Sequence, residues 1–277
     1  MKLAERVRLL VNRFQSVPFW LVHLVPLGSL WSGVRESDIA VCVGMYFTRM
    51  FFITAGYHRY FAHRSFRLNR FWQFVMALGG ALAAQKGPLW WASHHRVHHA
   101  FSDTPKDIHP PQKGFWWSHV GWIVSPLYRH REDSWIKDLL KFPELRWLDR
   151  YYLIPPVLLA VVLWFLGGWS MLFVGFFLST VLLFHGTFSI NSIAHRFGSR
   201  RYATADSSKN SFLLAVLTNG EGWHNNHHYY KYSARQGFYW WEIDVSFYVL
   251  KILSFFKIVH DLKPVPMDIR DRRLGGR

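Results

Sequence analysis

Cysteine is almost absent from this chain of 277 residues, which contains only Cys42. A disulfide within the chain needs two cysteines, and zinc or iron–sulfur sites built on thiolates need several, so both kinds of site are excluded. Acidic residues are also few, with 17 Asp and Glu against 33 Lys and Arg and a formal net charge of +16. Internal repeats, low-complexity linkers and a secretory signal pattern are lacking as well, and we expect one membrane-embedded domain over residues 1–277.

Hydrophobic residues, in contrast, make up 51% of the chain and include 15 Trp and 24 Phe. Disordered chains combine low hydrophobicity with high charge, so this composition excludes disorder. The apolar runs approach membrane-spanning length, and no soluble basic module that could bind nucleic acid is found. We therefore expect an integral membrane protein whose basic surface faces anionic lipid headgroups or an acidic partner rather than nucleic acid.

Four apolar stretches are long enough to form helices that cross a bilayer core of about 30 Å, which takes roughly 20 residues. They occupy about residues 17–34, 38–57, 151–166 and 169–191. Only Gly167 and Gly168 separate the last two stretches, which predicts a hairpin turn. The sequence thus predicts an all-α, polytopic membrane protein with four transmembrane helices.

Two further apolar stretches are interpreted differently. Residues 71–84 are interrupted by Gly79 and Gly80 and are too short to span, which favours a re-entrant, interfacial or protein-buried helix. Residues 237–259 mix aromatic and charged side chains, which is typical of a helix that lies at the interface. Arg49 falls inside the second predicted span, where we expect its charge to snorkel or to pair.

Basic residues flank the predicted spans unevenly. They precede the first span and follow the second and the fourth, at Lys2, Arg6, Arg8, Arg13, Arg59, Arg64, Arg67, Arg70, Arg196, Arg200, Arg201 and Lys209. The turn at 167–169 carries no charge, and the turn at 35–38 is nearly neutral. The positive-inside rule therefore places both termini and the polar segments 58–150 and 192–277 in the cytoplasm, as a histidine-rich helical cap.

Histidine is the residue in excess, with 16 copies that are grouped rather than scattered. Four groups stand out: His58 and His63; His95, His98 and His99; Asn191 and His195; and His224, His227 and His228. Residues three and four positions apart share one face of an α-helix, so each HxxHH triplet presents its imidazoles along one stripe. The adjacent histidines of a triplet diverge by about 100°, so each triplet can serve two neighbouring metals.

The five-residue spacing of His58 and His63 is less favourable, because it separates them by about 140° on an α-helix. They reach one metal only if the helix end unwinds or the metal lies near the axis. The other histidines are expected to have no metal role: His23, His94, His109, His119, His130, His185 and His260. Three carboxylates are candidates to orient metal-bound imidazoles, namely Asp103, Asp107 and Glu221.

Nine imidazoles exceed the four or so ligands that one zinc ion takes. Imidazole also suits iron, copper and nickel, and two metals with four or five histidines each would use the whole set and leave positions open for a small ligand. Iron is favoured, because a site beside lipid that is rich in aromatic side chains and lacks thiolates suits oxygen activation. Haem is a less suitable alternative, because paired triplets crowd too many histidines together for axial ligation.

The sequence around these histidines resembles the membrane-bound acyl-CoA Δ9-desaturase family, which includes the stearoyl-CoA desaturases. The similarity covers roughly residues 16–260 and includes ITAGYH at 53–58, HRVHH at 95–99, GFWWSHVGW at 114–122, NSIAHRFG at 191–198 and GEGWHNNHH at 220–228. The family's plan of four spans with a cytoplasmic cap is similar to the one inferred above from hydropathy and charge.

The resemblance implies a non-haem diiron centre and a reaction that inserts a cis double bond into a saturated acyl chain, expected at Δ9, with consumption of O₂ and two electrons and release of water. By position, one iron would be held by His58, His63, His95, His99 and His227. The other would be held by His98, His195, His224 and His228, with Asn191 near it through water. No catalytic residue beyond the metal ligands is expected.

The acyl tail must be kept in a dry tunnel, and the candidates for its lining are Trp90, Trp91, Trp116, Trp117, Trp122 and Phe188. Animal members of the family carry an Arg-Asp pair and later basic residues that engage CoA, whereas this chain has Ser93-His94 and Ser125-Pro126-Leu127 at these positions. CoA, acyl carrier protein and a phospholipid therefore all stay open as the acyl carrier. No fused cytochrome b5-like segment is found, so we expect a separate electron donor such as a ferredoxin or cytochrome.

Three alternative functions are considered. A hydroxylase or related monooxygenase has similar histidine groups, but the segments NSIAH and GEGWHNNHH favour a desaturase. A zinc membrane hydrolase would act without O₂ or a reductant. Metal transport or haem electron transfer would distribute histidines through the bilayer, whereas here the groups fall at or beyond its cytoplasmic edge.

Overall fold

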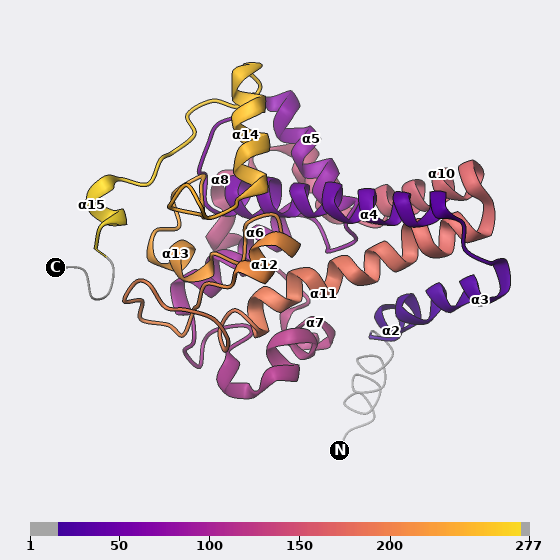
Figure 1. Cartoon of the computed structure of the whole chain (residues 1–277), viewed down its shortest axis with the longest axis horizontal. Helices are drawn as coiled ribbons and strands as arrows, with labels where there is room; N and C mark the ends of the chain where they lie inside the picture. The colour runs from indigo at the N-terminus through magenta and orange to yellow at the C-terminus, as the bar shows by residue number, and fades with distance from the viewer. Residues whose placement is uncertain (1–15, 273–277) are drawn as a thin grey trace.

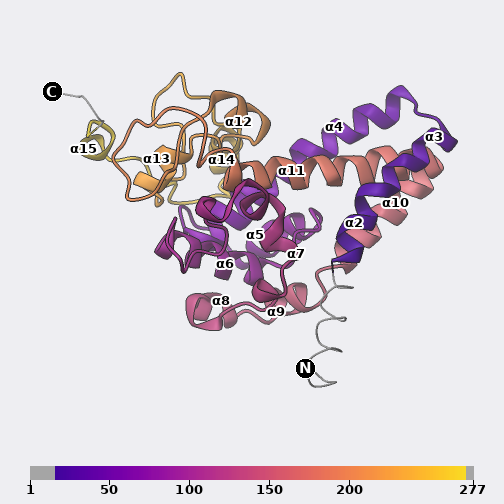
Figure 2. The ribbon, with the colours of Figure 1, turned by 90° about the horizontal axis from the view of Figure 1, so that it is seen from below.

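The computed structural model describes residues 16–272, and this part of the chain is helical, with isolated β-bridges but no strand. Figure 1 shows a rounded body that contains α5, α6, α8, α12, α13 and α14, and an arm of long helices that extends from it. The arm consists of α2, α3, α4, α10 and most of α11, as the second view confirms (Figure 2). The all-α expectation is therefore confirmed for the described residues.

The arm is built from helical segments that run into one another. Its first helix combines α2 (Val17–Leu24), the 3-10 turn η1 (Val25–Gly28) and α3 (Ser29–Ser32). Its second is α4 (Glu36–Phe51), which continues into the π-helix η2 (Phe52–Ala62). Its last part comprises α10 (Ile154–Ser170), the π-helix η7 (Met171–Leu178) and α11 (Ser179–Ser192).

Two of these continuous helices, Glu36–Ala62 and Ile154–Ser192, are long and apolar enough to cross a membrane, while Val17–Ser32 is a shorter apolar helix. Within Ile154–Ser192, Gly168 has a φ of 69° and a ψ of −157°, which interrupts the helix. Glycine adopts this conformation without the steric cost of a Cβ. The chain doubles back at this point, as Figure 1 shows at the far end of the arm, and α10 packs against η7. The predicted hairpin turn is confirmed.

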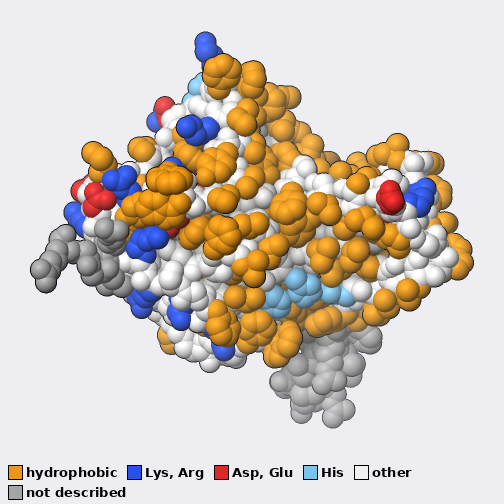
Figure 3. Space-filling view, viewed as in Figure 1, with side chains coloured by type: hydrophobic (Ala, Val, Ile, Leu, Met, Phe, Trp, Pro, Cys, Tyr) orange, Lys and Arg blue, Asp and Glu red, His pale blue; other side chains and the backbone are white. Residues whose placement is uncertain are grey.

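The surface of the arm is largely apolar (Figure 3). Trp31 and Phe165 are 74% and 75% exposed, as expected of side chains that face lipid rather than water. At the tip, Arg35 forms an ion pair with Asp38 at 2.8 Å and donates a hydrogen bond to the carbonyl of Gly167 at 2.5 Å. One guanidinium therefore ties together the two turns of the arm.

Arg49 is the one basic residue within the second predicted span, and it is 1% exposed. Its guanidinium donates hydrogen bonds to the hydroxyls of Ser179 at 2.5 Å and Thr180 at 2.7 Å, and to the carbonyl of Met45 at 3.1 Å. Arg49 thus pairs with neutral groups of α11 rather than snorkelling to the surface.

The helix α5 (Arg70–Ala81) corresponds to the stretch for which no span is expected. It packs against η2 through two glycines. A Cβ added to Gly79 would stand 2.3 Å from the ring of Phe52, and one added to Gly80 would stand 2.1 Å from the ring of Tyr57. A larger residue at either position would therefore separate the two helices. One face of this helix is buried against η2, while Phe71 is 65% exposed, so the choice among the three alternatives for this stretch stays a prediction.

The interfacial helix expected over residues 237–259 is shorter than predicted. Only α14 (Val245–Phe255) is helical, because the acidic residues before it turn inward. Glu242 and Asp244 are 0% exposed, and Asp244 caps the helix by accepting a hydrogen bond from the backbone N–H of Phe247 at 3.0 Å. The first third of the prediction is wrong for this reason.

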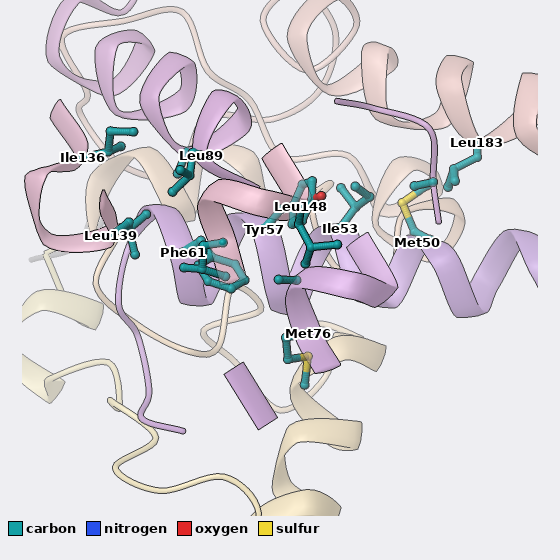
Figure 4. Close-up of a cluster of buried hydrophobic side chains, with 14 residues drawn as sticks. Met50, Ile53, Tyr57, Phe61, Met76, Leu89, Ile136, Leu139, Leu148 and Leu183 are labelled. Atoms are coloured by element: carbon teal, nitrogen blue, oxygen red, sulfur yellow. The ribbon is translucent and has the colours of Figure 1, made fainter. Parts of the chain in front are cut away.

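The main hydrophobic core lies where η2 meets α5 and α6 (Pro88–Phe101), as Figure 4 shows. Tyr57 and Phe61 of η2 are fully buried there, beside Met76 of α5 and Leu89 of α6. This packing fixes the relative position of the two helices that carry the first two histidine groups.

The remaining elements of the described chain are short. They are η3 (Pro111–Lys113), η4 (Trp117–Gly121), α7 (Trp122–Val124), η5 (Pro126–Tyr128), η6 (Asp133–Ile136), α8 (Lys137–Leu140), α9 (Pro143–Arg150), α12 (Phe212–Leu217), α13 (His224–Tyr229) and α15 (Met267–Arg270). Loops between them place α13 beside α6 and the end of η2, which brings the last histidine triplet to the first.

Candidate metal centre

The π-helical winding of η2 solves the spacing problem of His58 and His63. A π-helix forms hydrogen bonds between residues five apart, and the backbone N–H of His63 donates to the carbonyl of His58 at 3.2 Å. Residues five apart therefore lie on the same side, and the two imidazole centroids are 4.8 Å apart. The helix end does not unwind into a loop; it changes its winding instead.

Five imidazoles converge at the end of η2, from His58, His63, His95, His99 and His227. Their Nε2 atoms approach one another closely. The Nε2 atoms of His63 and His95 are 2.9 Å apart, and the Nε2 atom of His227 lies 3.0 Å from that of His58 and 2.9 Å from that of His99. A single ion could contact all five atoms with small adjustments.

Four further imidazoles form a neighbouring group, from His98, His195, His224 and His228. The Nε2 atoms of His195 and His224 are 3.0 Å apart, and the rings of His98 and His228 have centroids 5.2 Å apart. The two groups touch where His99 stacks on His228 at 4.5 Å. The structure thus brings all nine histidines together, in the two sets that the family resemblance implies; their role as ligands stays a prediction.

Carboxylates hold the outer nitrogens of four of these imidazoles. The Nδ1 atoms of His98, His228 and His195 lie 2.9 Å from Asp107, 2.7 Å from Asp206 and 3.2 Å from Asp103. The Nδ1 atom of His58 lies 2.5 Å from Glu221. When a carboxylate accepts a hydrogen bond from the Nδ1–H of an imidazole, the lone pair on Nε2 is free to point toward the centre of the histidine group. The three carboxylates expected for this role are present at these positions.

Asp206 is the carboxylate that the sequence did not reveal. It lies in an Ala-Asp-Ser loop that is 22 residues from His228, and no local spacing connects the two. The same loop folds back because Asn225 of α13 accepts hydrogen bonds from the backbone N–H groups of Arg201 and Tyr202 at 2.9 and 2.7 Å. The buried amide of Asn225, within the GEGWHNNHH segment, therefore helps to position the loop that carries Asp206.

Arg59 is buried, although the charge pattern of the sequence groups it with the basic residues of the cytoplasmic surface. Its side chain is only 1% exposed. Its guanidinium pairs with Glu221 at 3.0 Å and with Asp244 at 2.9 Å. Because Glu221 also holds His58, this buried ion network links the imidazole to the capped start of α14.

The electrostatic environment favours the neutral form of several of these imidazoles. Burial lowers the pKa of His95, His99, His224 and His227 well below the ordinary histidine value, and the neighbouring histidines lower it further. Neutral imidazole is the form that binds a metal. Burial alone would raise the pKa of Asp107, but the adjacent His98 and His109 rings and hydrogen bonds outweigh it and the pKa is lowered.

The donor set fits iron. The Nε2 atom of His228 and the Nδ1 atom of His224 are buried without a hydrogen-bond partner. A buried nitrogen without a partner is costly, and a metal ion bound within the group would satisfy the Nε2 lone pair of His228. The donors are imidazoles with carboxylates behind them and include no thiolate, which suits a non-haem iron centre.

The predicted tunnel residues separate into three places. Trp91 stacks on His95 with ring centroids 4.8 Å apart, and it belongs to the aromatic cluster around Trp90 and Trp122, which Trp117 joins. Phe188 lies elsewhere, packed with Val120 and Phe184. Trp116 is 74% exposed, so its assignment to a tunnel wall is wrong: a side chain on the molecular surface cannot line an interior passage.

Other predicted positions are less informative. Asn191 is half-buried on the last turn of α11, four residues before His195, and its water-mediated role stays a prediction. His109 lies beside His98 with ring centroids 4.3 Å apart, and with Asp107 these two form a third group that could hold a metal. The expected absence of a metal role for His109 therefore also stays a prediction.

Comparison with known proteins gives consistent matches. The fatty acid desaturase family model matches residues 38–250. The chain is 36% identical to the sn-1 stearoyl-lipid 9-desaturase of Anabaena variabilis over 95% of its length and 98% of the relative's. It is 43% identical to the sn-2 palmitoyl-lipid 9-desaturase of Nostoc sp. (strain 36) over 73% of each chain. It is 40% identical to the acyl-CoA 5-desaturase AL21 of Anemone leveillei over 82% of its length and 71% of the relative's.

Proposed function

Because the chain belongs to the fatty acid desaturase family, we propose that it inserts a cis Δ9 double bond into a saturated acyl chain linked to a membrane lipid. It is an oxidoreductase of lipid metabolism. The observation that carries the proposal is the convergence of nine imidazoles where the apolar arm meets the body of the molecule. An ordinary acid or base does not remove hydrogen from an unactivated methylene, so the reaction needs a centre of this kind.

The nine histidines are proposed to hold two iron ions, five in the first group and four in the second, with Asn191 near the second through water. When bound, the irons supply the activation of O₂ and the oxidising power that removal of two hydrogens requires. The side chains around them orient the ligands. Asp107, Asp206 and Asp103 fix the Nδ1 atoms of His98, His228 and His195, and burial lowers the pKa of His224, which favours its neutral form.

An apolar route supports access of an acyl chain from the bilayer. A cavity of about 560 Å³ opens between α2, α10 and α11, and its wall includes Val22, Ala84 and Phe184. Its lining is apolar, and its volume lies within the range of roughly 300–1,000 Å³ that ligand sites occupy. The same three residues belong to the apolar cluster that also includes Phe188 and Ile123.

From there the apolar contacts continue to the metal centre. Ile123 also packs against the cluster of Trp90 and Trp122, and Trp91 of that cluster stacks on His95. We propose that the reacting part of the acyl chain lies along these aromatic side chains, with Trp90, Trp91, Trp117, Trp122 and Phe188 keeping it dry.

A lipid-linked substrate is favoured over a CoA thioester. The positions that engage CoA in animal members are occupied internally here: Ser93 donates a hydrogen bond to the carbonyl of Glu132 at 2.8 Å, and His94 Nδ1 lies 2.8 Å from the carbonyl of Trp90. Two of the similar proteins are named as acting on stearoyl-lipid and palmitoyl-lipid.

The proposal includes a topology. We infer that residues 1–277 form one domain with four membrane spans, at about 17–34, 38–57, 151–166 and 169–191, and with both termini and the metal centre in the cytoplasm. The hairpin at Gly168 and the bond from Arg35 to Gly167 support a shared non-cytoplasmic end for these helices. All nine histidines lie at the other end.

A separate electron donor is proposed to dock over a polar pocket of about 390 Å³. The pocket is lined by His99, Ser102, Asp206 and His228, and thus reaches one imidazole of each group. Three basic residues lie within a few positions in sequence of residues that line the pocket: Lys106, Arg200 and Lys231. Opposite charge would steer an acidic ferredoxin or cytochrome to this face.

The test is expression of the chain in a host whose lipids are saturated and defined, followed by gas chromatography of the fatty acids and positional analysis of each lipid class. A cis-9 monoene that appears in intact glycerolipids supports the proposal. An alcohol without an alkene would point to a hydroxylase, and a product formed only in the acyl-CoA pool would contradict the lipid-linked substrate.

A further inference from the structure

Three histidines outside the metal centre form a continuous chain of hydrogen bonds. His23 of α2, His185 of α11 and His119 of η4 come from three separate elements. The Nε2 atoms of His23 and His185 are 3.2 Å apart, and the Nδ1 atom of His185 lies 2.9 Å from the Nε2 atom of His119. The chain ends at Ser192, whose Oγ lies 2.9 Å from the Nδ1 atom of His119. The sequence predicts no metal role for these three histidines.

The chain runs from the molecular surface into the interior. His23 and His185 are half-buried, His119 is 7% exposed and Ser192 is 0% exposed. Histidine side chains reach the surface beside α11, α7 and α2 (Figure 3). His23 lies six residues after the start of α2, about 9 Å along the helix, so in the proposed topology it lies within the first span, in its cytoplasmic half.

This geometry does not fit a metal site or a headgroup site. His185 uses its two nitrogens on opposite sides, so no point is adjacent to all three residues, and the groups of convergent ligand atoms among the described residues do not include them. The remaining nitrogen, Nδ1 of His23, lies 2.8 Å from the carbonyl of Phe19. All six imidazole nitrogens are therefore engaged within the chain, and a metal ion or a headgroup could bind only by displacing one of these hydrogen bonds.

The hydrogen bonds allow two complete arrangements of protons. A carbonyl only accepts, so His23 carries its proton on Nδ1 and its Nε2 accepts. In the neutral chain, His185 donates to His23, His119 donates to His185, and the hydroxyl of Ser192 donates to His119. Ser192 has a second acceptor, the carbonyl of Phe188 at 3.1 Å. When the hydroxyl turns to Phe188, its oxygen accepts from His119, and the chain holds one extra proton with every donor still paired.

We propose that His23, His185, His119 and Ser192 form a proton relay that serves the desaturation reaction. This inference rests on the proposed function, because forming the double bond with reduction of O₂ to two waters consumes two protons and two electrons from the separate donor. The extra proton moves by hops: as His185 Nε2 hands its proton to His23, its Nδ1 takes one from His119, and the reverse moves it inward. At the outer end, half-buried His23 exchanges the proton with water when its hydrogen bond to the carbonyl of Phe19 opens. Ser192 is the last residue of α11, three residues before His195, so the inner end of the relay adjoins the segment that carries a proposed metal ligand.

The test replaces His185 with Gln in the full chain. A glutamine side chain can donate and accept a hydrogen bond but cannot pass a proton from one side to the other, so the helices stay tied while the relay is broken. The matched control is His130→Gln, on an exposed loop outside the described sites. Both variants should keep the parent's iron content and thermal unfolding temperature.

Turnover of His185→Gln with its reductant and O₂ should fall about tenfold or more, in the range that a positioned proton-transfer group contributes. Added imidazole should restore much of it, and the solvent deuterium isotope effect on turnover should rise. Unchanged turnover overturns the proposal, and so does a loss that imidazole does not restore.

A second measurement is independent of the metal. In metal-free protein labelled with ¹⁵N-histidine, a coupling across the hydrogen bond between His119 and His185 should be seen by NMR and should vanish in His185→Gln. Its absence from the parent protein overturns the relay even if the enzyme proves to be a desaturase. A parent protein that shows the coupling but makes no alkene would refute the proposed function instead.

Discussion

Two groups of histidines lie near the end of α11, and they differ in where their ring nitrogens point. In the nine-histidine centre the Nε2 atoms converge, while Nδ1 atoms such as those of His98 and His228 face the carboxylates of Asp107 and Asp206. In the three-histidine chain the nitrogens run head to tail, and the ends meet a carbonyl and a hydroxyl. Convergence suits a cation, whereas a linear order with neutral partners suits a mobile proton.

The comparison teaches that the number of histidines does not define a metal site. Both groups contain imidazoles whose ring nitrogens lie less than 3.3 Å apart. A carboxylate behind an imidazole fixes one proton and frees the opposite lone pair for metal. A hydroxyl with two acceptors, as Ser192 is, leaves the proton free to occupy either of two positions. The variants below change one of these features at a time.

The largest effect is expected from removal of a convergent imidazole. His98→Ala should eliminate product, with a loss greater than the roughly 100-fold that removal of an outer partner costs, and it should lower the iron content. The protein should stay in the membrane, because His98 is not part of the main hydrophobic core. Fatty acid analysis and iron content per chain are the measurements.

His130→Ala provides the control for this variant, since that side chain is exposed. The same result is expected for His195→Ala and for His228→Ala. Full activity in any of the three would refute that residue as a ligand and would remove it from the convergent group.

An intermediate effect is expected from removal of a carboxylate behind an imidazole. Asp107→Asn keeps the shape of the side chain but loses the charge that holds the Nδ1 proton of His98. Iron affinity should fall by about 10- to 100-fold, and excess iron should restore activity. Competition with a chelator measures the affinity.

The exposed Asp133→Asn is the matched control for Asp107→Asn, because Asp133 is on the surface and, within residues 16–272, forms an ion pair only with Arg131. An unchanged iron affinity in Asp107→Asn would mean that the carboxylate is not what distinguishes the metal centre from the three-histidine chain.

Much of this comparison could be predicted from the sequence, because spacing determines which residues share a helix face. The triplets at 95–99 and 224–228 and the hairpin at Gly168 followed from periodicity, charge and two adjacent glycines. Three of the four anchoring carboxylates were also found. Long-range partners were not: Asp206 meets His228 across 22 residues, and no local pattern encodes that distance.

The winding of η2 and the burial of Arg59 show the same limit. A spacing of five residues is unfavourable for two histidines that share a metal only if the helix is an α-helix. Here η2 is a π-helix, against which α5 packs through Gly79 and Gly80. Arg59 counts as a surface charge until Glu221 and Asp244 are placed beside it. The orientation of the His185 ring depends on the packing of α2, η4 and α11 together, so the chain of histidines could not be predicted from the sequence.

The smallest effect, and the sharpest comparison, is expected from giving the three-histidine chain a carboxylate like those of the metal centre. Burial lowers the pKa of His119, and the groups that its nitrogens face are His185 and Ser192, neither of which carries a negative charge. In Ser192→Asp a carboxylate would face Nδ1, so the pKa of His119 should rise by about one unit or more. Because a raised pKa keeps the imidazole protonated to higher pH, the proton would stay on His119 instead of moving along the chain.

Turnover of Ser192→Asp should therefore fall severalfold at neutral pH while iron content stays that of the parent, and ¹⁵N NMR of the metal-free protein should show a protonated His119. Ser192→Ala is the control that removes the hydroxyl without adding a charge; its His119 should stay neutral, and its turnover should fall less. Equal turnover in the two variants would mean that the fixed charge has no effect on proton movement. The contrast between a fixed proton in the metal centre and a mobile one in the chain would then have to be abandoned.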